Sequence, residues 1–244
     1  MILGLGSSPC SLSLPSSLAW HPDGLTIRRA GPFEPTGQHE RREVEVAGPH
    51  PSGSGRSARA LATDAALLAN RLYQIKHKVP RSAVKELQKV TIWVEEREPH
   101  HPCMAYHPDA GWLREHDMNP DKARCVEIAN AANFLTWTRE QPWMVLHELA
   151  HAYHHQTLDR GFENPDVAGA YREARNAKTY ETVLHWDGRE TRHYATTNPM
   201  EYFAEATEAF FGANDFYPFV RAELKKHDPA VDVLLKKLWG GDRP

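Results

Sequence analysis

Residues 145–155 of this chain read VLHELAHAYHH, and the spacing of the polar residues in this stretch decides which fold to expect. His147 and His151 are four positions apart, so on a helix they share one face, and Glu148 follows the first histidine. Two imidazoles one turn apart can bind one metal ion, and a neighbouring carboxylate can hold a water molecule beside it. The stretch therefore predicts a helix that carries part of a zinc site.

A zinc ion that keeps one position for water needs a third protein ligand. The HExxHxxGxxH continuation is excluded, because the chain has His154 and Thr157 where that pattern requires glycine and histidine. His154 itself lies two turns from His147, too far along the helix to reach easily an ion held by the first pair. The remaining candidate is a carboxylate from a later helix.

Residues 198–212, NPMEYFAEATEAFFG, predict such a helix. Asn198 is a typical N-cap, Pro199 suits the first helical position, and Gly212 follows the expected end. The apolar residues of the segment supply the mass for packing against a core.

Three glutamates of that helix, Glu201, Glu205 and Glu208, share one face. Like charges at this spacing repel by about 0.2–0.5 kcal/mol per pair unless a cation compensates them. We expect Glu201 to be the third zinc ligand and Glu205 to accept a hydrogen bond from the ring N–H of a ligating histidine. The alternatives are a helix-capping glutamate at Glu201 and an ordinary ion pair at Glu205.

Composition narrows the class of protein. The chain has 244 residues, 41% of them apolar, and a formal charge of -3, which is typical of a globular protein and lacks the basic excess of a nucleic-acid binder. No apolar run approaches the ~20 residues that a transmembrane helix needs. The first twenty residues are mildly apolar and serine-rich but lack a basic start and a sustained apolar stretch, so we expect a weak export signal at best. The three cysteines form no CxxC pair.

The chain divides into a Gly/Pro/Ser-rich arm at 1–56 and a single domain at 57–244. Parts of the arm, GLTIRR and REVEVAG, alternate like strands and are expected to pair with the main sheet. We expect an α+β fold in which a small mixed sheet packs on the HExxH helix. Further expected elements are helices at 61–79, 82–90, 139–158, 164–177 and 229–239, strands at 90–96 and 124–130, and a hairpin at 182–194.

The HExxH helix is expected to begin at a capping box, TREQ at 138–141. The hairpin is expected to turn at Asp187 and Gly188 and to deliver Tyr194 to the start of the glutamate helix. Strand 124–130 is our candidate for the edge strand that binds an extended peptide by strand addition.

The motifs HELAHA and YATTNPMEYFAEA together resemble the gluzincin metallopeptidases. The likeness covers residues 143–212 and is strongest to the catalytic domain of anthrax lethal factor and to a group of uncharacterised bacterial metallopeptidases. It implies a zincin-like fold, zinc ligands His147, His151 and Glu201, a general base in Glu148, and Tyr194 as donor to the developing oxyanion. Nothing in the chain resembles the toxin's receptor-binding or substrate-docking domains, so its substrate is not implied.

The expected function is therefore zinc-dependent hydrolysis of peptide bonds by an endopeptidase, with one Zn²⁺ per chain and a peptide or protein as substrate. Three alternatives stay open. The same residues can hold a structural zinc in a non-catalytic interaction module, in which case Tyr194 only closes the hairpin. The protein can also be an aminopeptidase, although it lacks a G-x-M-x-N motif, or a hydrolase of non-peptide amides.

Overall fold

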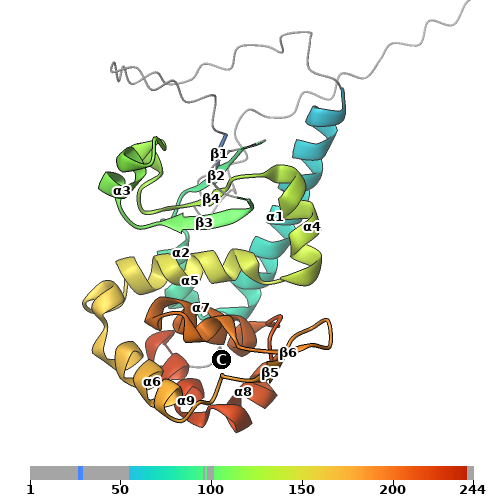
Figure 1. Ribbon diagram of the computed structural model, residues 1–244. Coiled ribbons are helices and arrows are strands. Elements are labelled where there is room, and N and C mark those ends of the chain that lie inside the picture. Colours follow the sequence, from blue (N-terminus) through green and yellow to red (C-terminus); the bar gives the residue numbers. More distant parts are fainter. Residues whose placement is uncertain (1–26, 30–54, 96, 98–101, 241–244) are drawn as a thin grey trace, which may run out of the picture.

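The computed structural model describes residues 27–29, 55–95, 97 and 102–240. The architecture is α+β, as the sequence predicts: a four-stranded sheet lies on one side of a helix, and a group of helices lies on the other (Figure 1). Most of residues 1–56, including the REVEVAG segment, lies outside the described residues.

The sheet is mixed and has the strand order β1-β2-β4-β3. Strands β1 (Ile27–Arg29), β2 (Ile92–Val94) and β4 (Cys125–Ile128) are parallel, and β3 (Met104–His107) runs antiparallel to β4. Because β1 comes from GLTIRR, the expectation that the arm pairs with the sheet is confirmed. The expectation that segment 124–130 forms the edge strand is wrong, because β3 pairs with β4 and covers that edge.

Helix α1 (Gly55–Lys78) and helix α2 (Arg81–Leu87) follow the sequence prediction closely. The apolar stripe of α1 is buried at Leu68, Leu72 and Ile75, and the chain turns at Pro80 because proline has no N–H to continue the hydrogen-bond ladder.

The HExxH helix begins later than expected. Helix α4 (Ala131–Glu140) ends at Gln141, and helix α5 (Met144–Gln156) is a separate element. The hydroxyl of Thr138 donates to the Phe134 carbonyl at 2.8 Å instead of capping a helix. The Gln141 side chain donates to Asp215 at 3.1 Å. The predicted capping box is therefore wrong, because both of its side chains have other partners.

The helices that follow α5 in the chain lie on its far side from the sheet (Figure 1). Three of them begin as predicted: Asn164, Asn198 and Asp228 each accept a hydrogen bond from backbone N–H groups of the first turn. These helices are α6 (Pro165–Asn176), α7 (Pro199–Phe211) and α9 (Pro229–Leu238). Between α6 and α7 lie the hairpin of β5 (Val183–Leu184) and β6 (Glu190–Thr191) and the turn η3 (Tyr194–Thr196). Helix α8 (Arg221–His227) lies between α7 and α9.

Two short elements, α3 (Ala110–Glu115) and η1 (Pro120–Lys122), lie between β3 and β4, and η2 (Gly161–Glu163) follows α5. They were not expected from the sequence, although Asp109 caps α3 in the usual way by accepting from the Trp112 N–H at 2.8 Å.

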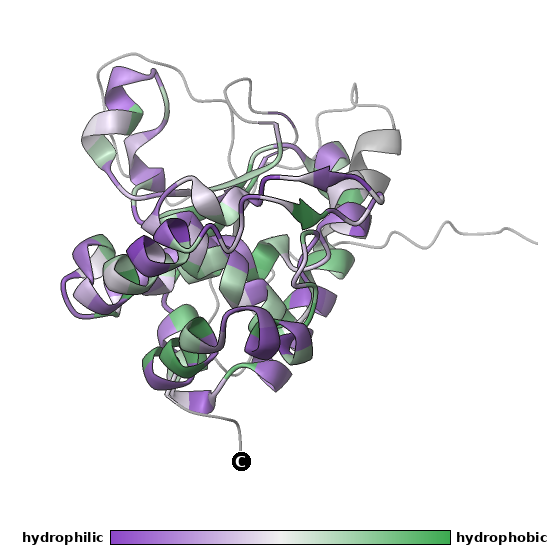
Figure 2. Cartoon of the chain, turned by 60° about the horizontal axis from the view of Figure 1, so that its bottom comes forward, coloured by the Kyte–Doolittle hydropathy of each residue, from purple (hydrophilic) through white to green (hydrophobic). Residues whose placement is uncertain are grey.

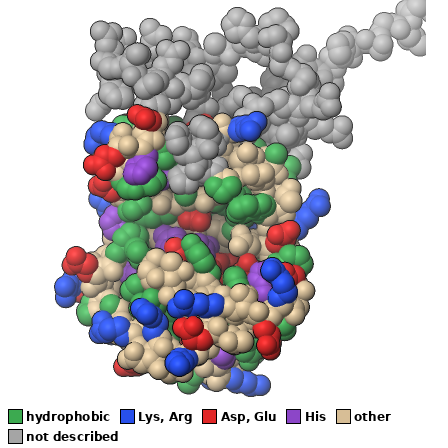
Figure 3. Space-filling model, in the orientation of Figure 1, with side chains coloured by type: hydrophobic (Ala, Val, Ile, Leu, Met, Phe, Trp, Pro, Cys, Tyr) green, Lys and Arg blue, Asp and Glu red, His purple; other side chains and the backbone are tan. Residues whose placement is uncertain are grey.

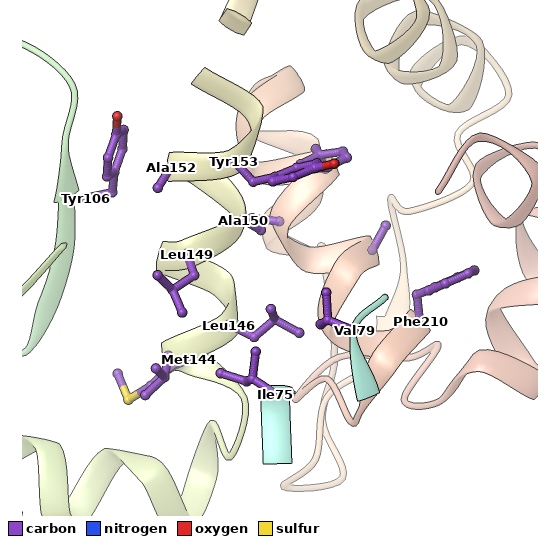
Figure 4. Close-up of a cluster of buried hydrophobic side chains, with 14 of the residues drawn as sticks. Ile75, Val79, Tyr106, Met144, Leu146, Leu149, Ala150, Ala152, Tyr153 and Phe210 are labelled. Atoms are coloured by element: carbon purple, nitrogen blue, oxygen red, sulfur yellow. The ribbon is translucent and has the colours of Figure 1, made fainter. Parts of the chain in front are cut away.

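The apolar core surrounds α5. Figure 4 shows Leu146 of α5 near Ile75 and Val79, with Tyr106 of β3 on the other side of the helix. Leu146 and Leu149 are almost fully buried, and burial of a leucine side chain stabilises a fold by about 1.5–3 kcal/mol. This packing fixes α5, so its polar face is held in a constant position against α7.

The helices below α5 carry both hydrophobic and hydrophilic residues (Figure 2). Among the described residues, no helix combines the length and the apolarity that crossing a bilayer requires.

Candidate metal centre

Helices α5 and α7 lie side by side and bring three predicted ligands together. His147 and His151 stand one turn apart on α5, and Glu201 stands at the third position of α7. The side chain of Asn198 accepts from the Glu201 N–H at 2.9 Å, so the cap fixes the first turn from which Glu201 projects.

The three donor atoms form a nearly equilateral triangle. Nε2 of His147 lies 3.1 Å from Nε2 of His151 and 3.1 Å from Oε2 of Glu201, and the remaining side is 3.3 Å. Ligands of a tetrahedral zinc ion, with bonds of about 2.0–2.1 Å, stand about 3.3 Å apart. His147, His151 and Glu201 therefore have the spacing that one zinc ion requires, and they could hold a metal.

The protons of His147 support the same conclusion. Its Nδ1 lies 2.8 Å from Oε1 of Glu208, so the ring donates there, and in the neutral ring Nε2 is left with a lone pair. That lone pair faces an oxygen of Glu201 at 3.1 Å. Two acceptors at this distance need a cation between them, which can be a proton or a metal ion.

The pKa values of His147 and Glu201 reflect this need for a cation between them. Burial favours neutral imidazole at His147, but hydrogen bonds to Glu201 and Glu208 raise its pKa well above the usual range. Burial likewise works against the Glu201 carboxylate, yet the hydrogen bonds from His147 and His151 hold its pKa far below the usual range. The cluster stabilises a positive charge at its centre.

The acceptor for the ring N–H is Glu208 instead of the expected Glu205. Oε1 of Glu205 lies 3.6 Å from Nδ1 of His147, and its Oε2 accepts from Asn214 at 2.7 Å. Nδ1 of His147 with Glu205 and Glu208 forms a second group close enough for a cation, but the bond to Glu208 already accounts for that nitrogen. Sequence reasoning placed Glu208 on the correct face and gave it no role.

Further buried carboxylates lie behind the three residues that could hold a metal. Burial raises the pKa of Glu208 to about 7, and burial followed by the charge of Glu208 raises that of Glu205. Asp215 is also buried nearby and adds to both shifts. Within the described part of the chain, no lysine or arginine forms an ion pair with Glu201, Glu205, Glu208 or Asp215.

Glu148 follows His147 on α5, and Tyr194 lies in η3, shortly before the first turn of α7 that carries Glu201. The side chain of Glu148 is partly exposed and makes no hydrogen bond or ion pair with any residue that the structure describes. Tyr194 is 49% exposed, and its pKa is raised by partial burial and by the charge of Glu201, with smaller effects of His147 and Glu148. Nδ1 of His193 accepts from the Ala195 N–H at 3.1 Å and so fixes the turn that presents Tyr194. Figure 3 shows histidine and acidic side chains in a hollow across the middle of this face.

A second buried histidine–glutamate cluster lies on the face of the sheet away from α5, and no sequence pattern predicted it. Nε2 of His107 contacts Oε2 of Glu127 at 2.6 Å, and the Lys122 ammonium bonds both Glu127 and Glu95. Burial opposes the charge of Lys122, but its bonds to Glu127 and Glu95 raise its pKa. This cluster contains its own cation.

Comparisons with the profiles of known protein families, with curated proteins and with solved structures found no match to the chain.

Proposed function

We propose that the protein is a zinc-dependent metallopeptidase with a zincin-like fold of the gluzincin type. The observation that carries the proposal is the convergence of His147, His151 and Glu201 on one point. Glu148 follows His147 on α5, and its side chain has no partner among the residues that the structure describes. The resemblance of both motifs to gluzincins supports the same assignment.

Each residue would have a defined task in hydrolysis. A zinc ion held by His147, His151 and Glu201 would supply a Lewis acid that activates water and polarises the carbonyl group. Glu148 would take the proton of the attacking water and pass it to the leaving nitrogen. The Tyr194 hydroxyl donates a hydrogen bond to the carbonyl oxygen as negative charge develops there. Glu208 holds the His147 ring in the orientation that directs Nε2 to the centre.

The substrate would bind along the outer edge of β3. The carbonyls of Cys103 and His107 accept from the N–H groups of Ala129 and Arg124, which flank β4, so the alternate residues Met104 and Tyr106 direct their backbone groups away from β4. An extended peptide can add to such an edge by main-chain hydrogen bonds. Strand β3 packs against α5, the helix that carries the proposed base Glu148.

A structural zinc in an interaction module is the competing function. Structural zinc sites are usually closed by four protein ligands, whereas three donors converge here and a half-exposed tyrosine stands beside them. Glu148 and Tyr194 have no task in a structural site, so the geometry favours hydrolysis.

The test is digestion of a mixed library of peptides blocked at both ends, read by mass spectrometry, with zinc-loaded protein. We expect cleavage by wild type and by Glu163→Gln, a control at an exposed glutamate. Glu148→Gln should retain zinc and lose about 10²–10⁴-fold in kcat/KM. Cleavage of unblocked peptides only would indicate an aminopeptidase. If zinc-loaded wild type cuts neither kind, the interaction module is the better assignment.

A further inference from the structure

A surface pocket adjoins the metal centre on the side of Tyr194, and its walls carry two arginines. It is lined by Arg175, Arg192, His193, Tyr194, Thr196 and Thr197. Tyr194 lines this pocket, and the turn η3 that carries it packs against α7, the helix of Glu201. A group bound here would therefore lie beside the reacting bond.

The two arginines differ in how far their charge is already compensated. Arg175 lies in the last turn of α6, exposed, with its guanidinium 5.6 Å from the centre of the Tyr171 ring. Among the residues that the structure describes, it has no carboxylate partner. Arg192 donates to Glu181 at 3.3 Å, and both side chains are largely exposed. Such an exposed pair contributes little, so Arg192 is easily shared with another carboxylate.

The surroundings leave the pocket positive. Lys178 lies next to it, in a small hollow that shares Arg175 and Thr196, and Glu181 is the acidic residue of that hollow. Basic side chains are visible on the surface directly below the hollow of the metal centre (Figure 3). This local charge contrasts with the formal charge of -3 of the whole chain.

We propose that this pocket is a specificity subsite for an acidic side chain of the substrate, a glutamate or aspartate close to the scissile bond. Arginine guanidinium groups bind carboxylates through paired, charge-assisted hydrogen bonds, and the exposed Thr197 hydroxyl offers a further donor. The proposal rests on the proposed peptidase function, since it names the substrate class of that site.

The test measures binding, so that it does not depend on turnover. Zinc-loaded Glu148→Gln protein is titrated with labelled ten-residue peptides of Ala, Leu and Ser, blocked at both ends, in which one Glu or one Gln is moved stepwise along the sequence. Fluorescence anisotropy gives each Kd. The blocked C-terminus keeps a terminal carboxylate from mimicking the side chain.

At one or two positions, the Glu peptide should bind about five- to tenfold more tightly than its Gln counterpart. Arg175→Ala and Arg192→Ala should each reduce this ratio, while Arg172→Ala, an exposed arginine of α6 outside the pocket, should leave it unchanged. Arg192→Glu should reverse the preference toward a Lys peptide. The ratio should fall as salt is raised, because the groups are exposed.

Equal affinity for Glu and Gln peptides at every position, or no binding of either, would overturn the subsite. So would a preference that survives both arginine substitutions, since the acidic side chain would then bind elsewhere. The peptidase proposal can fail on its own. If the preference depends on the arginines but wild-type protein cuts no peptide, the subsite is supported and the catalytic function is rejected.

Discussion

Two buried clusters of histidine and glutamate differ in the source of their positive charge. On the far face of the sheet, Lys122 supplies a cation to Glu127 and Glu95, and His107 adds a second donor. Between α5 and α7, the carboxylates outnumber the histidines, and no described lysine or arginine joins them. The first cluster is complete within the chain, whereas the second is balanced only by added protons or a metal ion.

Buried charge explains why this difference matters. Removal of an ionised group from water costs several kcal/mol unless a partner compensates it. In the sheet cluster, side chains of the chain itself compensate the buried charges, so this cluster has a structural role. The α5–α7 cluster has no lysine or arginine partner among the described residues, so we expect folding of this region to be coupled to the binding of protons or of a metal ion.

The largest effect is expected where the internal cation is removed. Lys122→Met leaves Glu127 buried without its ammonium partner and should reduce the free energy of unfolding by about 3–5 kcal/mol. Urea unfolding measures this, with Lys225→Met at an exposed position of α8 as the control. The loss should be the same with and without zinc. A loss that zinc restores would mean that the two clusters are not independent.

Removal of zinc should affect only the α5–α7 cluster. At a free zinc concentration of 100 times Kd, binding stabilises the folded state by about 2.7 kcal/mol. Thermal unfolding with and without a chelator should show this difference in wild type and in Lys122→Met. An unchanged Tm in wild type would contradict zinc as the cation of this cluster and would leave protons as the source of the positive charge.

A buried histidine offers a third case. His154 lies between Phe162 and Phe203, and its two ring nitrogens have no hydrogen-bond partner among the residues that the structure describes. Burial lowers its pKa to about 4 from the usual 6.5. Because the folded pKa is depressed, the stability that neutral His154 provides is complete above pH 6.5 and is lost as pH falls toward 4.

Between pH 7 and pH 5 this loss should amount to about 2 kcal/mol, at about 1.4 kcal/mol per unit of pKa difference. His154→Leu should shrink the difference in unfolding free energy between the two pH values by that amount, measured by urea unfolding of zinc-free protein. An equal acid sensitivity in the variant would assign the effect to other groups.

The smallest expected effect distinguishes the roles of Glu205 and Glu208. Glu208→Gln weakens the acceptor that orients His147 and should reduce zinc affinity about tenfold. Glu205→Gln should have little effect, because Glu205 is held by Asn214. Competition with a chromophoric chelator measures both. A larger loss in Glu205→Gln would restore the role that the sequence suggested for Glu205.

Features set by local patterns could be predicted from the sequence. The caps at Asn164, Asn198 and Asp228 and the apolar stripe of α1 depend on residues within one or two turns, and the helices form where expected. The grouping of His147, His151 and Glu201 also followed, because helical spacing and one known motif define it.

Features that depend on distant partners could not be predicted from the sequence. Gln141 ends α4 while its side chain bonds Asp215, 74 residues away in the chain, and no local pattern reveals this. The edge position of β3 depends on which strand pairs with β4. The choice between Glu205 and Glu208 depends on Asn214, which lies beyond the end of the helix.

Zinc stoichiometry and affinity, measured by isothermal titration calorimetry, test the central claim most directly. Wild type and Lys225→Met should bind one zinc per chain, and Glu201→Ala should bind it at least about tenfold more weakly, because it loses one of three ligands. Absence of zinc binding in wild type, or equal affinity in Glu201→Ala, would contradict the assignment of His147, His151 and Glu201 as the metal ligands.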